Sequence, residues 1–259
     1  SVRWNMKITI LGSGTAVPSL DRNSSGVLLK HNHFNWVFDF GYGNLHQLLR
    51  LGVSYHDIDR IFFTHNHPDH MCDLIPFLFG ARYQEDPRKK DLTIVGGSGF
   101  KEFFDGLMQA FKHWLIPTDY TLNIIEMDEE VCEFDGLRVE TRKVRHIEMS
   151  RGFRVSSPQG TSFALSGDTD YCQSMVELAQ NVDLMILECS FPDNMKVGGH
   201  LVPRLCGRLG AEACCQTLCL THFYPPCSPT EIERVCRKEF KGNLVLAEDL
   251  TTFDLSKDT

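Results

Sequence analysis

The segment 64–70 reads T-H-N-H-P-D-H and places three histidines and one aspartate within seven residues. Neutral imidazoles and carboxylates are the usual protein ligands of Zn and similar divalent ions. His65 and His67 follow an apolar run, and their spacing of two residues sends both rings to one side of a strand. Asp69 and His70 come just afterwards, so they can face a second ion. Four ligands cannot complete two sites, and the remaining ligands must lie downstream.

Three later residues have suitable side chains in suitable places. His146 follows the strand-like run E-T-R-K-V-R, Asp168 follows S-F-A-L-S-G, and His222 follows L-C-L-T. A histidine or aspartate at the end of one strand is usually structural when taken alone. Loops at strand ends converge on one edge of a sheet, however, and these three residues join the 64–70 segment there. Together they predict a metal site.

The elements that would position these residues alternate between strand-like and helix-like runs. Strands are predicted where β-branched and aromatic residues cluster, and helices where apolar residues recur with helical spacing. The predicted strands cover 7–12, 26–30, 35–40, 57–64, 92–95, 122–126, 137–145, 152–156, 161–166, 183–187 and 217–221. The predicted helices lie at 43–52, 69–80, 171–180 and after His200. Two strand-rich halves, each followed by helices, indicate two packed sheets with helices outside, in one domain over residues 1–259.

Composition limits the class of protein. A chain of 259 residues with 42% hydrophobic content can bury a sizeable core. Its ten cysteines form no C-x-x-C pair, which predicts reduced thiols. The net charge of -8 disfavours a polynucleotide substrate, because the overall field repels phosphate. The sequence contains neither an apolar run of about 18 residues nor a signal-peptide pattern, so we expect a cytoplasmic protein that does not contact membranes.

Two further segments could bind an anion or a nucleic acid. The turn G-G-S-G at 96–99 could hold phosphate through backbone N–H groups, although a lone glycine turn is more often only a turn. The segment R-Y-Q-E-D-P-R-K-K at 82–90 is basic, although such a run is more often a solvated loop. Neither segment outweighs the acidic balance of the chain.

The T-H-N-H-P-D-H segment resembles the H-x-H-x-D-H signature of the metallo-β-lactamase superfamily, and the three later residues match its later motifs in order. The runs L-G-S-G-T-A-V-P-S-L-D-R-N-S-S, D-F-G-Y-G-N and S-G-D-T resemble, more narrowly, the ribonuclease Z-like branch. The resemblance covers nearly the whole chain and implies an α/β fold, the four-layer αββα sandwich, with a dinuclear metal site. It implies that one ion binds His65, His67 and His146, that the other binds Asp69, His70 and His222, and that Asp168 bridges them.

The types of these residues separate classes within the superfamily. An aspartate at 168 instead of a cysteine argues against the common β-lactamase type, and His67 argues against redox diiron members, which carry a glutamate there. Hydrolysis remains. Two ions about 3.5 to 4 Å apart could lower the pKa of a bridging water to near 7 and bind the oxygens of a phosphodiester. Zn is the expected metal, and Mn or Fe would suit the same ligands.

A second pair of residues bears on the kind of hydrolysis. In the ribonuclease Z-like branch a histidine before a helix protonates the leaving oxygen, and a glutamate orients it. His200 in G-G-H-L-V-P and Glu188 in L-M-I-L-E-C-S-F match these positions, although His200 could instead be a helix-capping surface residue. A positioned acid contributes roughly 100- to 10,000-fold. The resemblance implies a phosphodiesterase in which a metal-bridging hydroxide attacks phosphorus, with Asp69, His200 and Glu188 as catalytic residues.

The chain departs from ribonuclease Z in one respect that bears on the substrate. The long arm that grips tRNA would fall between His146 and Asp168, where this chain has room only for a hairpin, and the H-E-A-T-like motif is altered to L-E-C-S. We therefore expect a small phosphodiester substrate, such as a cyclic nucleotide. The alternatives are a tRNA 3′-end endonuclease, a sulfate-ester or lactone hydrolase, and a non-catalytic metal-binding or sensory module. Related enzymes are often homodimers, although the sequence does not indicate the oligomeric state.

Overall fold

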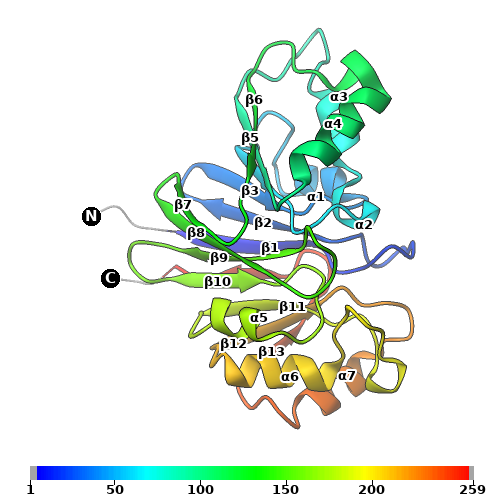
Figure 1. Ribbon diagram of the computed structural model, residues 1–259, viewed down its shortest axis with the longest axis vertical. Helices are drawn as coiled ribbons and strands as arrows, with labels where there is room; N and C mark the ends of the chain where they lie inside the picture. The colour runs from blue at the N-terminus through cyan, green and yellow to red at the C-terminus, as the bar shows by residue number, and fades with distance from the viewer. Residues whose placement is uncertain (1–4, 257–259) are drawn as a thin grey trace.

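Two seven-stranded mixed sheets face each other in the computed structural model, which describes residues 5–256. Helices cover the outer face of each sheet (Figure 1). The predicted four-layer αββα sandwich is therefore confirmed. Among the described residues, no helix is long and apolar enough to cross a membrane.

The first sheet contains the first and the last strands of the chain, side by side. In spatial order its strands are β14 (Thr252–Asp254), β1 (Met6–Gly12), β2 (Gly26–His31), β3 (Phe34–Phe38), β4 (Arg60–Phe62), β5 (Leu92–Gly96) and β6 (Leu122–Glu126). Pairing is antiparallel from β14 to β3 and parallel from β3 to β6. The helical segments of this half are α1 (Asn44–Arg50), α2 (Pro68–Met71), α3 (Leu74–Gly80), α4 (Phe100–Phe111) and η1 (Lys112–Leu115).

The second sheet has the same division into antiparallel and parallel parts. In spatial order its strands are β13 (Asn243–Leu246), β12 (Thr217–Thr221), β11 (Leu184–Glu188), β10 (Ser162–Leu165), β9 (Arg151–Ser156), β8 (Leu137–Lys143) and β7 (Val131–Phe134). Pairing is parallel from β13 to β10 and antiparallel from β10 to β7. Its helical segments are α5 (Gln173–Leu178), η2 (Asp193–Met195), α6 (Pro203–Glu212) and α7 (Pro229–Cys236).

Aromatic side chains fill the space between the sheets. Phe38 and Phe62 of the first sheet stack on each other with ring centroids 4.8 Å apart. Each ring also meets one from the second sheet edge-on, Phe38 against Phe163 and Phe62 against Phe153, both at 5.7 Å. All four side chains are fully buried. Rings of this size carry a large hydrophobic contribution and restrict the relative position of the two sheets, from whose ends the functional loops emerge.

The sequence reading differs from the structure in a few elements. The single helix predicted over 69–80 is divided into α2 and α3, because Pro76 has no N–H to donate to the carbonyl of Cys72 and its ring clashes with that carbonyl. The strands β7, β13 and β14 and the helix α7 were not predicted. All ten cysteines are free thiols, as expected.

Candidate metal centre

The loops that follow β4, β8, β10 and β12 meet at one edge of the sandwich, as expected for strand ends that face the same way. They bring together the seven residues selected from the sequence, which we call the His/Asp cluster: His65, His67, Asp69, His70, His146, Asp168 and His222. Their ligand atoms fall into groups whose members lie within 4.8 Å of one another. Residues that follow different strands and lie far apart in the sequence therefore converge, as predicted.

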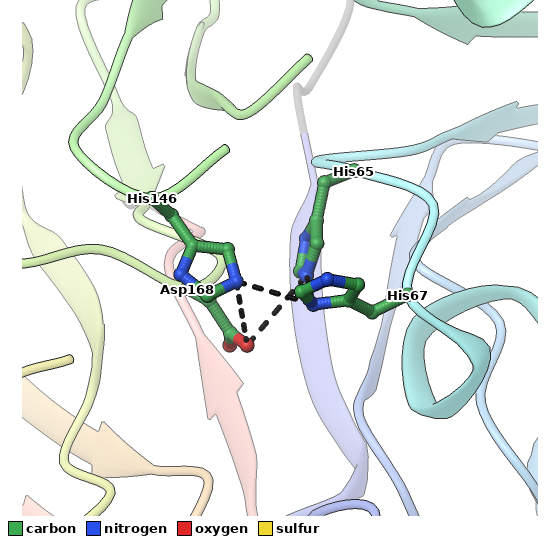
Figure 2. Close-up of side chains that lie close together, drawn as sticks. All are labelled: His65, His67, His146 and Asp168. Carbon is green, nitrogen blue, oxygen red and sulfur yellow. Dashed lines mark hydrogen bonds and ion pairs between the residues drawn. The ribbon is translucent and has the colours of Figure 1, made fainter. Parts of the chain in front are cut away.

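The first group joins three imidazoles at one point. The Nδ1 atom of His67 lies 3.1 Å from Nε2 of His65 and 3.2 Å from Nε2 of His146. Figure 2 shows the three rings and the carboxylate of Asp168 directed toward one another, with His65 and His67 on one loop and His146 and Asp168 on two others. His67 thus presents Nδ1, whereas the other two histidines present Nε2.

The second group lies next to the first. Nε2 of His222 is 3.3 Å from Nε2 of His70 and 3.3 Å from Oδ2 of Asp69. All three side chains are buried. The short helix α2 holds Asp69 and His70, and it begins at Pro68, whose fixed φ suits the first position of a helix.

Asp168 lies between the two groups and divides its oxygens between them. Its Oδ1 is 3.1 Å from Nε2 of His70 and 3.3 Å from Nε2 of His222. Its Oδ2 is 3.6 Å from Nε2 of His65 and 3.7 Å from Nε2 of His146. A carboxylate in this position could bridge two ions.

Surrounding acceptors fix the tautomers of the ligand histidines. The hydroxyl of Thr64 donates to Asp39 at 2.8 Å, so it can only accept from Nδ1–H of His65, 3.0 Å away. Asp39 also accepts from Nδ1–H of His70 at 2.8 Å, and the carbonyl of Gly199 accepts from Nδ1–H of His146 at 3.0 Å. In the neutral rings Nε2 is therefore left as a lone pair that faces the cluster.

His222 is oriented in the same way by Ser190. The Ser190 hydroxyl donates to Glu188 at 2.6 Å and therefore accepts from Nδ1–H of His222 at 2.9 Å. Asp39, which directly follows β3, and His222 both have backbone φ near +60°. This left-handed conformation is uncommon for residues other than glycine and is found where a functional geometry over-determines the backbone.

Burial and charge set the protonation of the cluster. Burial lowers the pKa of His65 well below its ordinary value, and it also lowers the pKa of His146. Burial would raise the pKa of Asp168, but His222 and His70 lower it well below its ordinary value. For His70 burial is outweighed by Asp168 and Asp39, which raise its pKa, so a proton competes with a cation for that nitrogen.

These observations fit divalent metal ions. In their neutral forms His65, His70, His146 and His222 direct an Nε2 lone pair at the cluster, where His67 and two carboxylates join them. Within residues 5–256 the buried Oδ1 of Asp168 accepts no hydrogen bond. An orphaned carboxylate oxygen among imidazole lone pairs is costly without a cation. The donor set, nitrogen and carboxylate oxygen, is the one that Zn and its neighbours bind.

His200 and Glu188 form a second feature beside the cluster. Nδ1 of His200 donates to Oε1 of Glu188 at 2.7 Å. The backbone N–H groups of Thr169, Ser190 and Leu201 also donate to this buried carboxylate. Burial would lower the pKa of His200, but the hydrogen bond and charge of Glu188 raise it. His200 does not cap α6, whose N-cap residue is Val202, so the structure does not support the helix-capping reading.

Sequence reasoning missed Ser190, Asp39 and Thr64 as supports of the cluster. Asp39 accepts three hydrogen bonds, from Thr64 N, Thr64 Oγ1 and His70 Nδ1. Serine and threonine are too common in loops to stand out. The aspartate in D-F-G directly after a buried strand was the one available signal.

One weaker sequence hypothesis fails in the structure, and one residue of the basic segment is placed differently from expectation. The backbone N–H groups of Gly99 and Lys101 at the start of α4 donate to Oε1 of Glu126, so a carboxylate already occupies the place proposed for phosphate. Arg88 in the basic segment 82–90 is not a solvated residue. It is fully buried, and its guanidinium donates to backbone carbonyls, among them that of Ile58.

The amino-acid sequence of the chain is similar to those of known proteins. A family model described as "Anti-Pycsar protein Apyc1" matches residues 6–231. A ribonuclease Z of Brevibacillus brevis is 29% identical, and the match covers 85% of this chain and 86% of that protein. That alignment spans 273 positions, whereas 85% of 259 residues is about 220, so roughly fifty positions have no counterpart in this chain.

Solved structures show the same architecture. The metallo-β-lactamase fold protein YhfI from Bacillus subtilis superposes with a TM-score of 0.86 at 22% identity, covering 96% of this chain and 99% of that one. Human tRNase Z, short form, superposes with a TM-score of 0.76 at 25% identity, covering 96% and 98%. The fold and the arrangement of its layers are therefore shared over nearly the whole chain.

Proposed function

The chain belongs to the family described as Anti-Pycsar protein Apyc1, in the ribonuclease Z-like branch of the metallo-β-lactamase superfamily, and it is a hydrolase; on that premise we propose that it hydrolyses small phosphodiesters, such as cyclic nucleotides. In this proposal two divalent ions, most simply Zn, occupy the His/Asp cluster. His200, oriented by Glu188, protonates the leaving oxygen.

The observation that carries the proposal is the connection between the acid and the cluster. Glu188 accepts from Nδ1 of His200 through Oε1 and from the hydroxyl of Ser190 through Oε2, and Ser190 in turn accepts from His222. One buried carboxylate thus orients both the proposed acid and a proposed metal ligand. An alkoxide is a poor leaving group, and its protonation is the task that such an acid performs.

The two groups of residues in the His/Asp cluster suggest how two metal ions would be held. His65, His67 and His146 would bind one ion, Asp69, His70 and His222 the other, and Asp168 would contribute one oxygen to each. When bound, such a pair of ions supplies a nucleophile at neutral pH and neutralises the charge that develops on the phosphoryl oxygens. The proton on Nε2 of His200 would remain available to the leaving group on the side of the cluster nearest His146 and His222.

The proposed size of the substrate depends on the connection between His146 and Asp168. The strands β9 and β10 in this interval form a simple antiparallel hairpin in which Ser156 pairs with Ser162. No arm extends from it within the described residues. The basic segment at 82–90 offers a smaller basic surface than its sequence suggests, since Arg88 is buried and Lys89 and Lys90 are exposed. A small phosphodiester therefore fits better than tRNA.

A pair of substrates would test the role of the acid separately from the role of the metals. Bis(p-nitrophenyl) phosphate has a leaving group that hardly needs protonation, whereas a 3′,5′-cyclic nucleotide releases an alkoxide. In metal-loaded protein, His200→Ala should lower turnover of the cyclic nucleotide by roughly 100- to 10,000-fold and turnover of the activated ester by far less. His46→Ala, which alters an exposed histidine on α1, is the matched control.

The opposite outcomes are distinct. Protein with two bound ions per chain that cleaves neither ester would overturn the phosphodiesterase proposal, and sulfate esters and lactones would be assayed next. Cleavage of precursor tRNA at its 3′ end, with no turnover of cyclic nucleotides, would instead show the ribonuclease activity that names the relatives.

A further inference from the structure

Two aromatic side chains border the proposed acid and are used by nothing described so far. Phe191 and Tyr224 stack with ring centroids 4.6 Å apart and an interplanar angle of 14°. Both rings stand nearly perpendicular to the imidazole of His200, at 77° and 73°. Tyr224 is also 5.7 Å from the ring of His222. Each of the two side chains is only half-buried, so part of each ring is accessible to a ligand.

The backbone fixes this aromatic pair relative to the catalytic groups. Phe191 directly follows Ser190, and the N–H of Tyr224 donates to the carbonyl of Ser190 at 3.2 Å. The thiol of Cys227 donates to the same carbonyl at 3.2 Å. The loops after β11 and β12 are therefore joined at Ser190, whose hydroxyl contacts Glu188 and His222. The pair cannot shift independently of the acid.

The hydroxyl of Tyr224 is the polar part of this surface. It makes no hydrogen bond within residues 5–256. A half-buried tyrosine hydroxyl without a protein partner can donate its hydrogen bond to a polar substrate atom.

We infer that Phe191 and Tyr224 form the nucleobase subsite of the enzyme, with the base of a nucleotide stacked on the aromatic pair and its sugar oxygen next to His200. This inference rests on the proposed function, because it places the nucleoside on the side of the leaving oxygen. Every nucleobase is planar and has a π-face, whatever hydrogen-bond donors and acceptors it carries. Stacking of this kind therefore favours nucleotides as a class.

Binding of two ligands that differ only in the base tests the inference without relying on turnover. Calorimetric titration of metal-loaded protein would use adenosine 5′-monophosphate and ribose 5-phosphate. Tyr224→Leu and Phe191→Leu should each weaken the nucleotide by about 5- to 150-fold, the range that base–aromatic stacking contributes, and change ribose 5-phosphate by less than about twofold. Tyr224→Phe should keep most of the preference for the nucleotide.

The controls separate this inference from the activity itself. Trp114→Leu removes an exposed aromatic ring from η1 and should leave both titrations unchanged. Equal weakening of both ligands, or no weakening of the nucleotide, would overturn the stacking subsite even if phosphodiesters are hydrolysed. If the wild-type protein hydrolyses no phosphodiester but still prefers the nucleotide to ribose 5-phosphate, the proposed function is overturned and the nucleobase subsite is supported.

Discussion

Each of the two opposite edges of the sandwich holds an aspartate carboxylate, 4% exposed for Asp168 and 12% exposed for Asp135, and the two carboxylates are completed differently. Asp135 lies in the turn between β7 and β8, where Arg60 donates to both of its oxygens at 2.8 and 3.0 Å and Trp36 Nε1 donates at 2.9 Å. Asp168, at the other edge, is surrounded by imidazoles that have directed their Nδ1 protons elsewhere. Its Oδ1 accepts no hydrogen bond from the described residues.

The difference separates a structural ion pair from a binding site. A carboxylate whose oxygens are fully used by cationic or N–H donors belongs to the framework, and it needs nothing from solution. A carboxylate among lone pairs is stable only when a cation is added. The same residue type thus has different roles at the two edges, and its hydrogen-bond partners show which role it has.

Substitution of Asp168 should have the largest effect. Asp168→Asn keeps the volume of the side chain but removes the charge that the two groups of ligands share, so kcat/KM for a phosphodiester should fall on the order of 1,000-fold. The content of metal per chain, measured by elemental analysis, should fall with it. Full metal content with unimpaired turnover would show that Asp168 does not bridge the ions.

Removal of metal should lower stability because it leaves the cluster incomplete. With free metal at about 100 times its dissociation constant, a bound ion contributes about 2.7 kcal/mol, and a chelator should remove that contribution. The measurement is thermal unfolding with and without chelator, in wild-type protein and in Asp135→Asn. The chelator effect should be equal in both, because the two edges are independent. An apo protein as stable as the loaded one would contradict the cluster as a metal site.

Substitution of Asp39 tests the support of the cluster and not its ligands. Asp39→Asn tolerates the left-handed backbone but cannot accept from both Thr64 and His70 through two carboxylate oxygens. Loss of such a support typically costs 10- to 100-fold in metal affinity or activity. Competition with a chromogenic chelator would measure the affinity. Unchanged affinity would show that the orientation of His70 does not depend on Asp39.

Substitution of Asp135 should affect stability alone. Asp135→Asn weakens charge-assisted hydrogen bonds to Arg60, and we expect a loss of about 2 kcal/mol in the free energy of unfolding, measured with denaturant, with no change in turnover. Burial would raise the pKa of Asp135, but the Arg60 and Trp36 hydrogen bonds lower it below the ordinary 3.8. The contribution is therefore present above pH 3.8 and disappears as the pH falls through the folded-state pKa. A difference between wild type and variant that grows in acid would contradict this.

The seven residues of the His/Asp cluster could be chosen from the sequence because four of them lie in one segment and the others follow strong strand patterns. The supports could not be chosen, since they depend on contacts between distant loops. Asp39 reaches His70 across 31 residues, and Ser190 reaches His222 across 32. Arg88 was assigned to solvent because a charged run is usually exposed, whereas backbone carbonyls of neighbouring loops surround it.

The pairing of β1 with β14 has a consequence for the order in which the molecule forms. Ile8 pairs with Phe253, so this edge of the first sheet joins two segments that are 245 residues apart in the sequence. At a synthesis rate of roughly 5 to 20 residues per second, β1 exists for about 10 to 50 seconds before its partner has been made. Every cluster residue is synthesised before β14, while one sheet still has an open edge. Folding of this chain is therefore dominated by non-local contacts, which favours slow folding and a need for protection of that edge.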